Sequence, residues 1–517
     1  MKRRNFVKSL ALASAGTPIL LNEMKFQSIG KKLFDVSKSA DDRVLVIIRL
    51  NGGNDGLNTV IPRDQYSDLT IQRNNIIIPE SLVLPLTNEV GLHPVMTGMK
   101  GMYDSGKLGI IQNVGYPEQN RSHFRSMDIW SSGLIDNAAT TGWLGRDFDN
   151  HYPNYPDAYP DAQNPDPFAI SMGYEVSSTC QGLMANFSHA VNNPFDVYNL
   201  ASSGAIDDGT YYGSHIDYLT TLIDQANAYG GQINTAANAG NTMSTMYDPN
   251  NPLAVQLQYV AQMISGGLQS KVYVLNIDGF DTHDAQVSAT DTTTGTHADL
   301  MKRLSDAISA FQDDLQLLGL EHRVAGMTFS EFGRQIASNA SRGTDHGDAA
   351  PLFLFGTCLD FSLMGNNPTV GSTIVNQAGI PMEVDFRDIY ASILKDWFGV
   401  ASSEIQSLFE HTVTFYPMLG ACSLSVEEED DLAQDKALIY PNPSFGNSTI
   451  RFAAQNEWVK IVVFDLMGRQ VAEVFDGNLN QGRHDIKMEL TDLQNGEYIV
   501  NIQKSSGSVS CNLLKAK

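Results

Sequence analysis

Acidic and histidine side chains recur where apolar runs of this chain end or are about to begin. The residues concerned are Asp55, Asp281, His283, Glu331, Asp345 and His346. Several carboxylates at one site repel one another unless protons or a cation compensate them. A mixed set of Asp, Glu and His without Cys suits Zn, Mn, Fe or Mg. The pattern therefore predicts a divalent metal site, although a single Asp after a strand is also a common turn former or helix cap.

A second group of candidates lies in the stretch NRSHFRS, residues 120–126. Ser122 precedes an apparent helix, where serine commonly caps the first turn. In a functional role its hydroxyl would be a nucleophile beside the helix N-terminus, which favours an anionic substrate. His123 would then take part in catalysis, and with Arg125 it would bind oxygen atoms of that substrate. The sequence leaves the capping and the catalytic interpretation of Ser122 open.

These side chains need a scaffold that brings distant segments together. Apolar, β-branched runs predict buried strands in residues 44–50, 107–115, 271–281, 323–333 and 351–356. Apolar residues recur at intervals of three and four in 297–319, which predicts an amphipathic helix, and 385–399 predicts a last helix. Strands alternating with helices are typical of an α/β fold with a mostly parallel sheet flanked by helices. The turn-rich residues 150–260 are interpreted as a cap or insertion over the sheet.

The N-terminus and the overall charge indicate where the protein acts. Residues 1–25 combine Arg3, Arg4 and a short apolar run, which resembles a twin-arginine export signal and is too short to span a membrane. The 34 basic and 58 acidic residues give a formal charge of −24, which argues against nucleic acid as a partner. The unbroken acidic block 427–431 predicts a solvated linker over residues 421–436.

Residues 437–517 change to short alternating strands separated by Gly, Asn and Asp, which predicts a small β-sandwich. The motifs YPNP, DLMGRQV and NGEYIVNI occur in it in this order. This combination resembles the C-terminal sorting domain of the type IX secretion system of Bacteroidetes. The resemblance implies the type IX machinery as a partner, and a protein that is exported and then held at the cell surface or secreted.

Seven further motifs identify the large domain, residues 26–420. They are LNGGNDGLNTVIP, NRSHF, TGWLGR, DGFDTHDAQ, TFSEFGR, GTDHG and RDIYASILKDWFG. In this order they resemble the bacterial family called domain of unknown function 1501, which is placed with the alkaline phosphatase and sulfatase superfamily. The resemblance implies an alkaline-phosphatase-like fold and a metal site for phosphate or sulfate esters.

The superfamily pattern implies roles for individual residues. Ser122 would stand at the nucleophile position, and Asp55 or Asn54 would supply the carboxylate position after the first strand. Asp281 with His283, Glu331, and His346 would resemble the remaining ligands. Two departures place a second metal in doubt: Asp281 and His283 are closer than the usual spacing, and Phe332 follows Glu331 where a His is common. His297 is an alternative ligand.

The sequence thus predicts an exported, metal-dependent hydrolase of phosphate or sulfate esters. The alternative is a noncatalytic binding protein of the cell envelope, which keeps the fold and binds a glycan or a protein partner through the turn-rich segment. A formylglycine-dependent sulfatase is excluded, because the residues after Ser122 lack the required Pro.

Overall fold

The computed structural model describes residues 42–135, 139–196, 200 and 209–420 of the large domain. In the C-terminal domain it describes 437–515, apart from 441–443, 445–446, 466, 481, 491–492 and 506. The predicted signal peptide, residues 1–25, and the predicted linker, residues 421–436, lie outside these ranges. No helix of the described residues is long and apolar enough to cross a bilayer.

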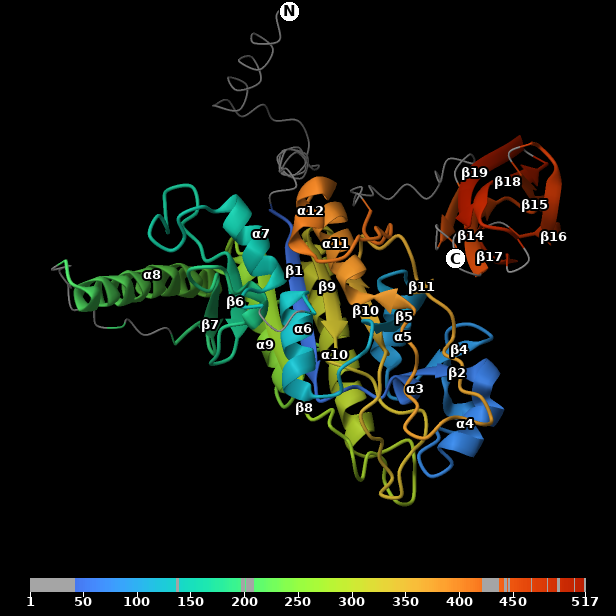
Figure 1. The fold of residues 1–517 in the computed structure, drawn as a ribbon, viewed down its shortest axis with the longest axis horizontal. Helices are drawn as coiled ribbons and strands as arrows, with labels where there is room; N and C mark the ends of the chain where they lie inside the picture. Colours follow the sequence, from blue (N-terminus) through green and yellow to red (C-terminus); the bar gives the residue numbers. More distant parts are fainter. Residues whose placement is uncertain are drawn as a thin grey trace, which may run out of the picture. The chain divides into compact units, whose positions relative to one another are not determined.

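A nine-stranded sheet forms the centre of the large domain (Figure 1). Its order is β11-β5-β10-β9-β1-β8-β6-β7, and β12 pairs with β5. The bounds are β1 (Val44–Asn51), β5 (Leu108–Gly115), β6 (Ala169–Met172), β7 (Ser188–Val191), β8 (Val272–Asp278), β9 (Val324–Phe329), β10 (Ala350–Gly356), β11 (Leu363–Met364) and β12 (Val384–Asp385). Every pairing in it is parallel except those of β10 with β5 and β9. The predicted α/β class with a mostly parallel sheet is confirmed.

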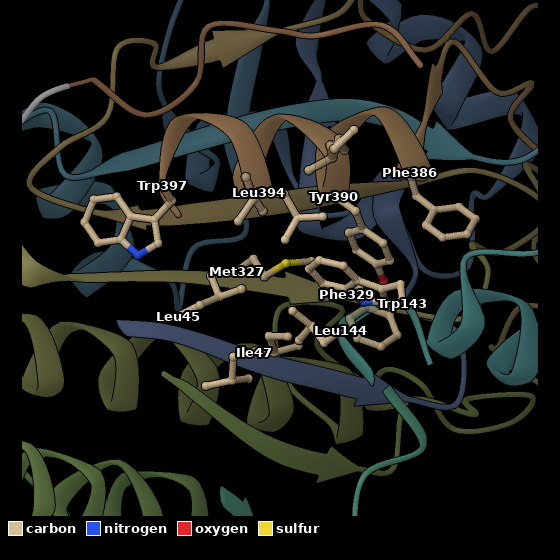
Figure 2. Close-up of a cluster of buried hydrophobic side chains, with 14 of the residues drawn as sticks. Leu45, Ile47, Trp143, Leu144, Met327, Phe329, Phe386, Tyr390, Leu394 and Trp397 are labelled. Atoms are coloured by element: carbon tan, nitrogen blue, oxygen red, sulfur yellow. The ribbon is translucent and has the colours of Figure 1, made fainter. Parts of the chain in front are cut away.

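Helices cover both faces of the sheet because its central strands are apolar on both sides. Val46 and Ile48 of β1 face the first layer, which contains α5 (Thr97–Asp104), α9 (Pro252–Ser265), α10 (Thr296–Leu317) and part of α8 (Tyr211–Ala239). Leu45 and Ile47 face the second layer, which contains α6 (His123–Ser132), α7 (Trp143–His151), α11 (Phe386–Asp396) and α12 (Ser402–Leu408). Figure 2 shows Trp143 of α7 and Tyr390 of α11 packed over β1 and β9, with ring centroids 4.3 Å apart.

The predicted strands and helices are found, and the segment 150–260 differs from its interpretation. It supplies β6 and β7, which extend the central sheet beyond β8, as well as α8 and α9. The strands β6 and β7 have only four residues each, so alternation or an apolar run is hard to recognise in them. The segment is therefore partly an integral edge of the sheet.

A small three-stranded sheet lies beside the large one in the chain region 56–92. It contains β2 (Val60–Pro62), β3 (Leu84–Pro85) and β4 (Val90–Leu92), accompanied by α3 (Gly56–Thr59) and α4 (Tyr66–Gln72).

The C-terminal domain is antiparallel and consists of two sheets, β13-β14-β17 and β16-β15-β18-β19. Its strands are β13 (Ala437–Tyr440), β14 (Asn447–Ala454), β15 (Glu457–Asp465), β16 (Gln470–Leu479), β17 (Gly482–Glu489), β18 (Gly496–Lys504) and β19 (Gly507–Lys515). Alternate residues such as Val459, Ile461 and Val463 form its core, as expected for a β-sandwich.

Candidate metal centre

Most of the predicted site residues lie at one edge of the large sheet. The strands β1, β8 and β9 are parallel and end at this edge. Asp281 and His283 follow β8 there, and Glu331 follows β9. Strand β10 is antiparallel and therefore begins at that edge, which places the preceding His346 beside them. Helix α6 begins eight residues after β5 and adds His123. Five chain segments thus meet where ligands of open α/β sheets bind.

Two glycines after β1 allow this close approach. Gly52 has φ +124°, and a Cβ atom there would lie 2.2 Å from the backbone nitrogen of Asp281. Gly53 has φ +85°, and a Cβ atom there would lie 2.4 Å from the ring of Phe332. Side chains at these positions would both strain the backbone and push the Asp281 and Phe332 loops outward. The pair of glycines is therefore a structural requirement of the site.

Three imidazoles surround the carboxylate of Asp281, and we call His123, His283, His346 and Asp281 the three-histidine cluster. Asp281 Oδ1 lies 3.1 Å from His283 Nε2 and 3.2 Å from His346 Nε2, and these two nitrogens are 3.0 Å apart. Asp281 Oδ2 lies 3.5 Å from His123 Nε2. The side chain of Asp281 is 47% exposed, so a small ligand has access to the cluster.

The opposite ring nitrogen of each histidine has a hydrogen-bond acceptor. His123 Nδ1 lies 2.8 Å from Glu331 Oε1, His283 Nδ1 lies 2.8 Å from Asp345 Oδ1, and His346 Nδ1 lies 2.9 Å from the carbonyl oxygen of Arg121. Ionised carboxylates and carbonyls only accept, so Nδ1 donates in all three cases. A neutral imidazole then carries its lone pair on Nε2, and these three lone pairs face Asp281.

This donor set fits a divalent cation. Lone pairs and a carboxylate that face one another without a proton or a cation between them are repulsive. The triangle of His283 Nε2, His346 Nε2 and Asp281 Oδ1 has sides of 3.0–3.2 Å. A tetrahedral site with bonds of about 2.0 Å has edges of about 3.3 Å. Ligand atoms of His123, Asp281 and His346 also lie within 4.8 Å of one another. The cluster could therefore hold a metal, with Nδ1 bonds that orient the rings as in many metal sites.

Glu331 and Asp345, predicted as ligands, lie one layer outside the cluster. Glu331 is 2% exposed, and its Oε1 accepts from the backbone nitrogen of Gly52 at 2.8 Å as well as from His123. Asp345 Oδ1 accepts from Asn339 Nδ2 at 3.2 Å as well as from His283. Their carboxylates orient the imidazoles of the cluster.

Arg334 supplies a fixed positive charge beside the cluster. Its guanidinium is fully buried and donates to Asp281 Oδ1 at 2.8 Å, and to the carbonyl oxygens of Gly52, Gly53, Phe280 and Thr344. Burial alone would raise the pKa of Asp281, but the hydrogen bond and the positive charge of Arg334 oppose it, and the pKa is lowered. Burial lowers the pKa of His346. Asp281 is therefore ionised and His346 neutral at neutral pH, the states that metal binding requires.

Asp55, predicted as a ligand, lies in a buried ion pair instead. Its Oδ1 and Oδ2 accept from Arg73 at 3.0 and 2.9 Å, and Oδ2 also accepts from Gln286 at 2.6 Å. Both residues are essentially unexposed. These bonds engage both oxygens, so the geometry does not support Asp55 as a ligand.

His297, the alternative ligand, lies near Asp55. It is buried, its Nε2 lies 3.1 Å from Asn54 Oδ1, and burial lowers its pKa to about 4. It is a neutral histidine of the interior, outside the three-histidine cluster.

Ser122 occupies the N-cap position of α6, as the capping interpretation predicts, but its hydroxyl forms no cap hydrogen bond. It is exposed, and no hydrogen bond within the described residues joins it to the cluster. Both of its chain neighbours contact the cluster, because the Arg121 carbonyl accepts from His346 and the His123 ring faces Asp281. Ser122 is thus held at the rim of the cluster with a free hydroxyl.

Helix α6 itself is fixed to the loop after β9. Ser126 Oγ, Trp130 Nε1 and Gln119 Nε2 all donate to the carbonyl oxygen of Glu331, the last two at 2.9 and 3.0 Å. These bonds position both His123 and Glu331. Arg125, predicted to bind substrate, donates to the carbonyl oxygen of Ile135 instead.

The sequence reasoning missed Arg49. Arg49 lies in β1 on the same face as Leu45 and Ile47, opposite Asn276 of β8. Its Nε atom is buried and has no hydrogen-bond partner among the described residues, and the same holds for Asn51 Oδ1 and Asn276 Oδ1. The sequence feature that could have identified Arg49 is its position as a single Arg within the otherwise apolar run VLVIIRL.

Comparisons with known proteins follow the same division into two domains. Residues 105–409 match the family model described as "Protein of unknown function (DUF1501)". Residues 438–515 match the "Secretion system C-terminal sorting domain". The second match indicates a protein that is exported to the cell surface or released, with the secretion machinery as its partner. No curated protein matches the chain.

Solved structures give only distant likenesses. An alkaline phosphatase superfamily protein from Vibrio parahaemolyticus is 9% identical, with 87% of this chain and 79% of that chain covered and a TM-score of 0.34. The PsFucS1 sulfatase from Pseudoalteromonas sp. is 9% identical, with coverage of 89% and 86% and a TM-score of 0.35. The alkaline phosphatase from the Antarctic bacterium TAB5 is 10% identical, with coverage of 71% and 98% and a TM-score of 0.24.

Proposed function

The chain belongs to the DUF1501 family, and from the geometry of its three-histidine cluster we propose that it is an exported, metal-dependent hydrolase of phosphate or sulfate esters. The observation that carries the proposal is the convergence of three Nε2 atoms on Asp281, each with its Nδ1 held by an acceptor. An imidazole-rich donor set favours Zn, Mn or Fe over Mg. The twin-arginine route, which carries folded proteins, is proposed for its export.

Different residues of the chain would have different roles in ester hydrolysis. When bound, a divalent cation supplies Lewis acidity at an ester oxygen, as in other hydrolytic metal sites. His123, His283, His346 and Asp281 would hold it, and Glu331 and Asp345 orient two of the rings. Ser122 would attack the phosphorus or sulfur atom with its oxygen and lose its proton to solvent water, at the N-terminus of α6, where the helix dipole favours negative charge. In this first step the ester oxygen would leave on the opposite side and take up a proton from water as the free alcohol. Water would then cleave the resulting seryl ester, which releases phosphate or sulfate and restores the serine hydroxyl.

Arg49 would bind the anionic part of the ester. An arginine stays charged in proteins, so a buried and unpaired guanidinium nitrogen is costly unless a ligand supplies the acceptor. Burial lowers the pKa of Arg49, while the nearby Glu331 and Asp278 carboxylates raise it. Arg49 therefore lies within electrostatic reach of Glu331, which contacts His123 of the cluster. The unpaired oxygens of Asn51 and Asn276 beside it would accept from hydroxyl groups of the same substrate.

Arg49→Met tests this role. A hydrogen bond to a charged group contributes about 1.5–3 kcal/mol, so we expect KM for an anionic ester to rise roughly 10- to 150-fold. The melting temperature should stay the same or rise, because the substitution removes a buried Nε atom that has no hydrogen-bond partner among the described residues. Steady-state kinetics and thermal denaturation measure the two effects. Arg49→Lys should retain part of the affinity for the ester. An unchanged KM in Arg49→Met would mean that another group binds the anionic part of the substrate.

Hydrolysis itself is tested with the purified full chain, stripped of metal by a chelator and reloaded with Zn²⁺ or Mn²⁺. We expect metal-dependent release of phosphate or sulfate from aryl esters and from esters of saccharides. Substrate turnover should require the reloaded metal.

Ser122→Ala identifies the nucleophile in the same assay. If the serine hydroxyl attacks, kcat falls by about 10³ or more, while metal content and KM change little. Full activity in Ser122→Ala would assign the attack to water and leave the ester hydrolase proposal standing.

A second candidate function is a noncatalytic binding protein of the cell envelope. It is favoured by large apolar side chains that are widely exposed after β6 and β7: Tyr174 is 85%, Leu183 77% and Tyr212 74% exposed. Exposed apolar groups of this kind commonly mark interaction sites. Metal binding without turnover of any phosphate or sulfate ester would favour this candidate.

A further inference from the structure

Helices α7 and α12, which pack against each other, carry a second group of possible ligands (Figure 1). Asp147 and His151 lie four residues apart on α7 and therefore share one helix face. Glu404 of α12 faces them. Ligand atoms of the three side chains lie within 4.8 Å of one another. None of these residues belongs to the three-histidine cluster.

Asp147 is a buried carboxylate with an imidazole nearby: His151 Nδ1 lies 3.7 Å from its Oδ1, which is too far for a hydrogen bond. Its neighbours Trp143, Leu144 and Phe148 anchor α7 in the core, and Asp147 is only 6% exposed. Its Oδ1 accepts no hydrogen bond from any residue that the structure describes. Burial raises the pKa of Asp147 to about 6. A buried carboxylate in this state is normally paired or bound to a metal.

His151 presents the correct nitrogen to such a cation. Its Nδ1 donates to the carbonyl oxygen of Asp147 at 2.8 Å, because a carbonyl can only accept. The lone pair of the neutral ring is therefore on Nε2, which lies 3.7 Å from Glu404 Oε1. This distance is slightly longer than the edge of about 3.3 Å in a tetrahedral zinc site. A small movement of Glu404, whose side chain is 30% exposed, closes the difference.

We propose that Asp147, His151 and Glu404 form a second metal site, which binds a divalent transition-metal ion of the Zn²⁺ class and links α7 to α12. One imidazole with two carboxylates favours Zn²⁺ over Ca²⁺ and Mg²⁺, which prefer oxygen ligands alone. The side chains of His151 and Glu404 are 43% and 30% exposed, so ions can enter and water can complete the coordination. The site stabilises the second helix layer and does not depend on the ester hydrolase proposal.

The test counts zinc in the full chain after chelation, reloading with Zn²⁺ alone and removal of free ion. His151→Gln and Glu404→Gln should each contain one zinc less than the parent protein, and their melting temperatures should no longer rise with added Zn²⁺. Glu410→Gln, at an exposed acid just beyond α12, is the matched control and should keep the parent's zinc. Circular dichroism verifies that each variant is folded.

Two further variants separate this site from the three-histidine cluster. Asp281→Asn should lose its own zinc and keep the one at α7, so adding His151→Gln to it should remove one more. Co²⁺ bound to Asp281→Asn should give a visible absorption band that disappears with His151→Gln. Unchanged zinc content in both His151→Gln and Glu404→Gln would overturn the proposal and mean that the three residues form an ion-pair group only.

Discussion

Asp281→Asn is expected to abolish both metal binding at the three-histidine cluster and ester hydrolysis. Asp281 is the one carboxylate that all three Nε2 atoms face, at 3.1–3.5 Å, and its charge balances the bound cation. The amide oxygen of asparagine can still accept from Arg334, so the fold should persist. Elemental analysis should show one equivalent of metal fewer, and the hydrolysis rate should fall to the background of the metal-free protein.

Asp284→Asn is the matched control, since Asp284 is an exposed carboxylate of the same loop. It should retain metal and activity. Asp345→Asn gives an intermediate case, because a partner that orients a ligand contributes about 10–100-fold to metal affinity. If Asp281→Asn keeps its metal and its activity, Asp281 is not a ligand of the catalytic metal. If the parent protein itself binds no metal and hydrolyses no ester, the cluster is a hydrogen-bonded scaffold around Arg334 and the binding protein becomes the better candidate.

The position of most cluster residues could be predicted from the sequence. Apolar runs locate β1, β8, β9 and β10, and the polar residues beside these runs must then meet at the sheet edge. His346 precedes its strand, yet joins the cluster because β10 runs antiparallel to β9. The sequence contains no local signal for that direction. His346 was grouped with the others because it stands just before an apolar run, and the superfamily resemblance implied its role as a ligand.

The roles within the site were harder to predict than its position. Glu331 and His123 were assigned as ligand and catalytic group, whereas the structure turns the His123 ring toward Asp281 and places Glu331 behind it. Side-chain reach and ring orientation decide this, and both depend on packing of α6 against the loop after β9. The role of Asp55 could not be predicted from the sequence either. Its partner Arg73 follows 18 residues later, at the end of a helix that has no recognisable motif.

Asp55→Asn is expected to lower the free energy of unfolding of the large domain by about 3–5 kcal/mol, the usual cost of leaving one charge of a buried pair unpaired. Arg73 would keep its bonds to the carbonyl oxygens of Gln335 and Ile336, at 2.9 and 3.0 Å, but would lose its only carboxylate partner among the described residues. Because Gln335 and Ile336 belong to the loop that carries Glu331 and Arg334, the metal centre should loosen as well. Chemical denaturation and metal titration measure the two effects.

Three comparisons decide whether the pair itself is responsible. Asp104→Asn, in the exposed pair with Lys100, is the matched substitution and should cost at most about 0.5 kcal/mol. Asp55→Leu combined with Arg73→Met should cost less than Asp55→Asn alone, because no buried charge remains unpaired. Equal costs for Asp55→Asn and Asp104→Asn would contradict the argument.

Acid denaturation provides the third comparison. Burial tends to raise the pKa of Asp55, but Arg73, His297 and Gln286 outweigh it and lower the pKa below its ordinary value. The unfolded chain therefore binds this proton first, so the stabilisation from Asp55 is fully present above about pH 4 and is lost as the pH falls through the folded pKa. Asp55→Asn should remove this part of the acid sensitivity. Identical acid denaturation of the variant and the parent would show that the pair is not the group that titrates.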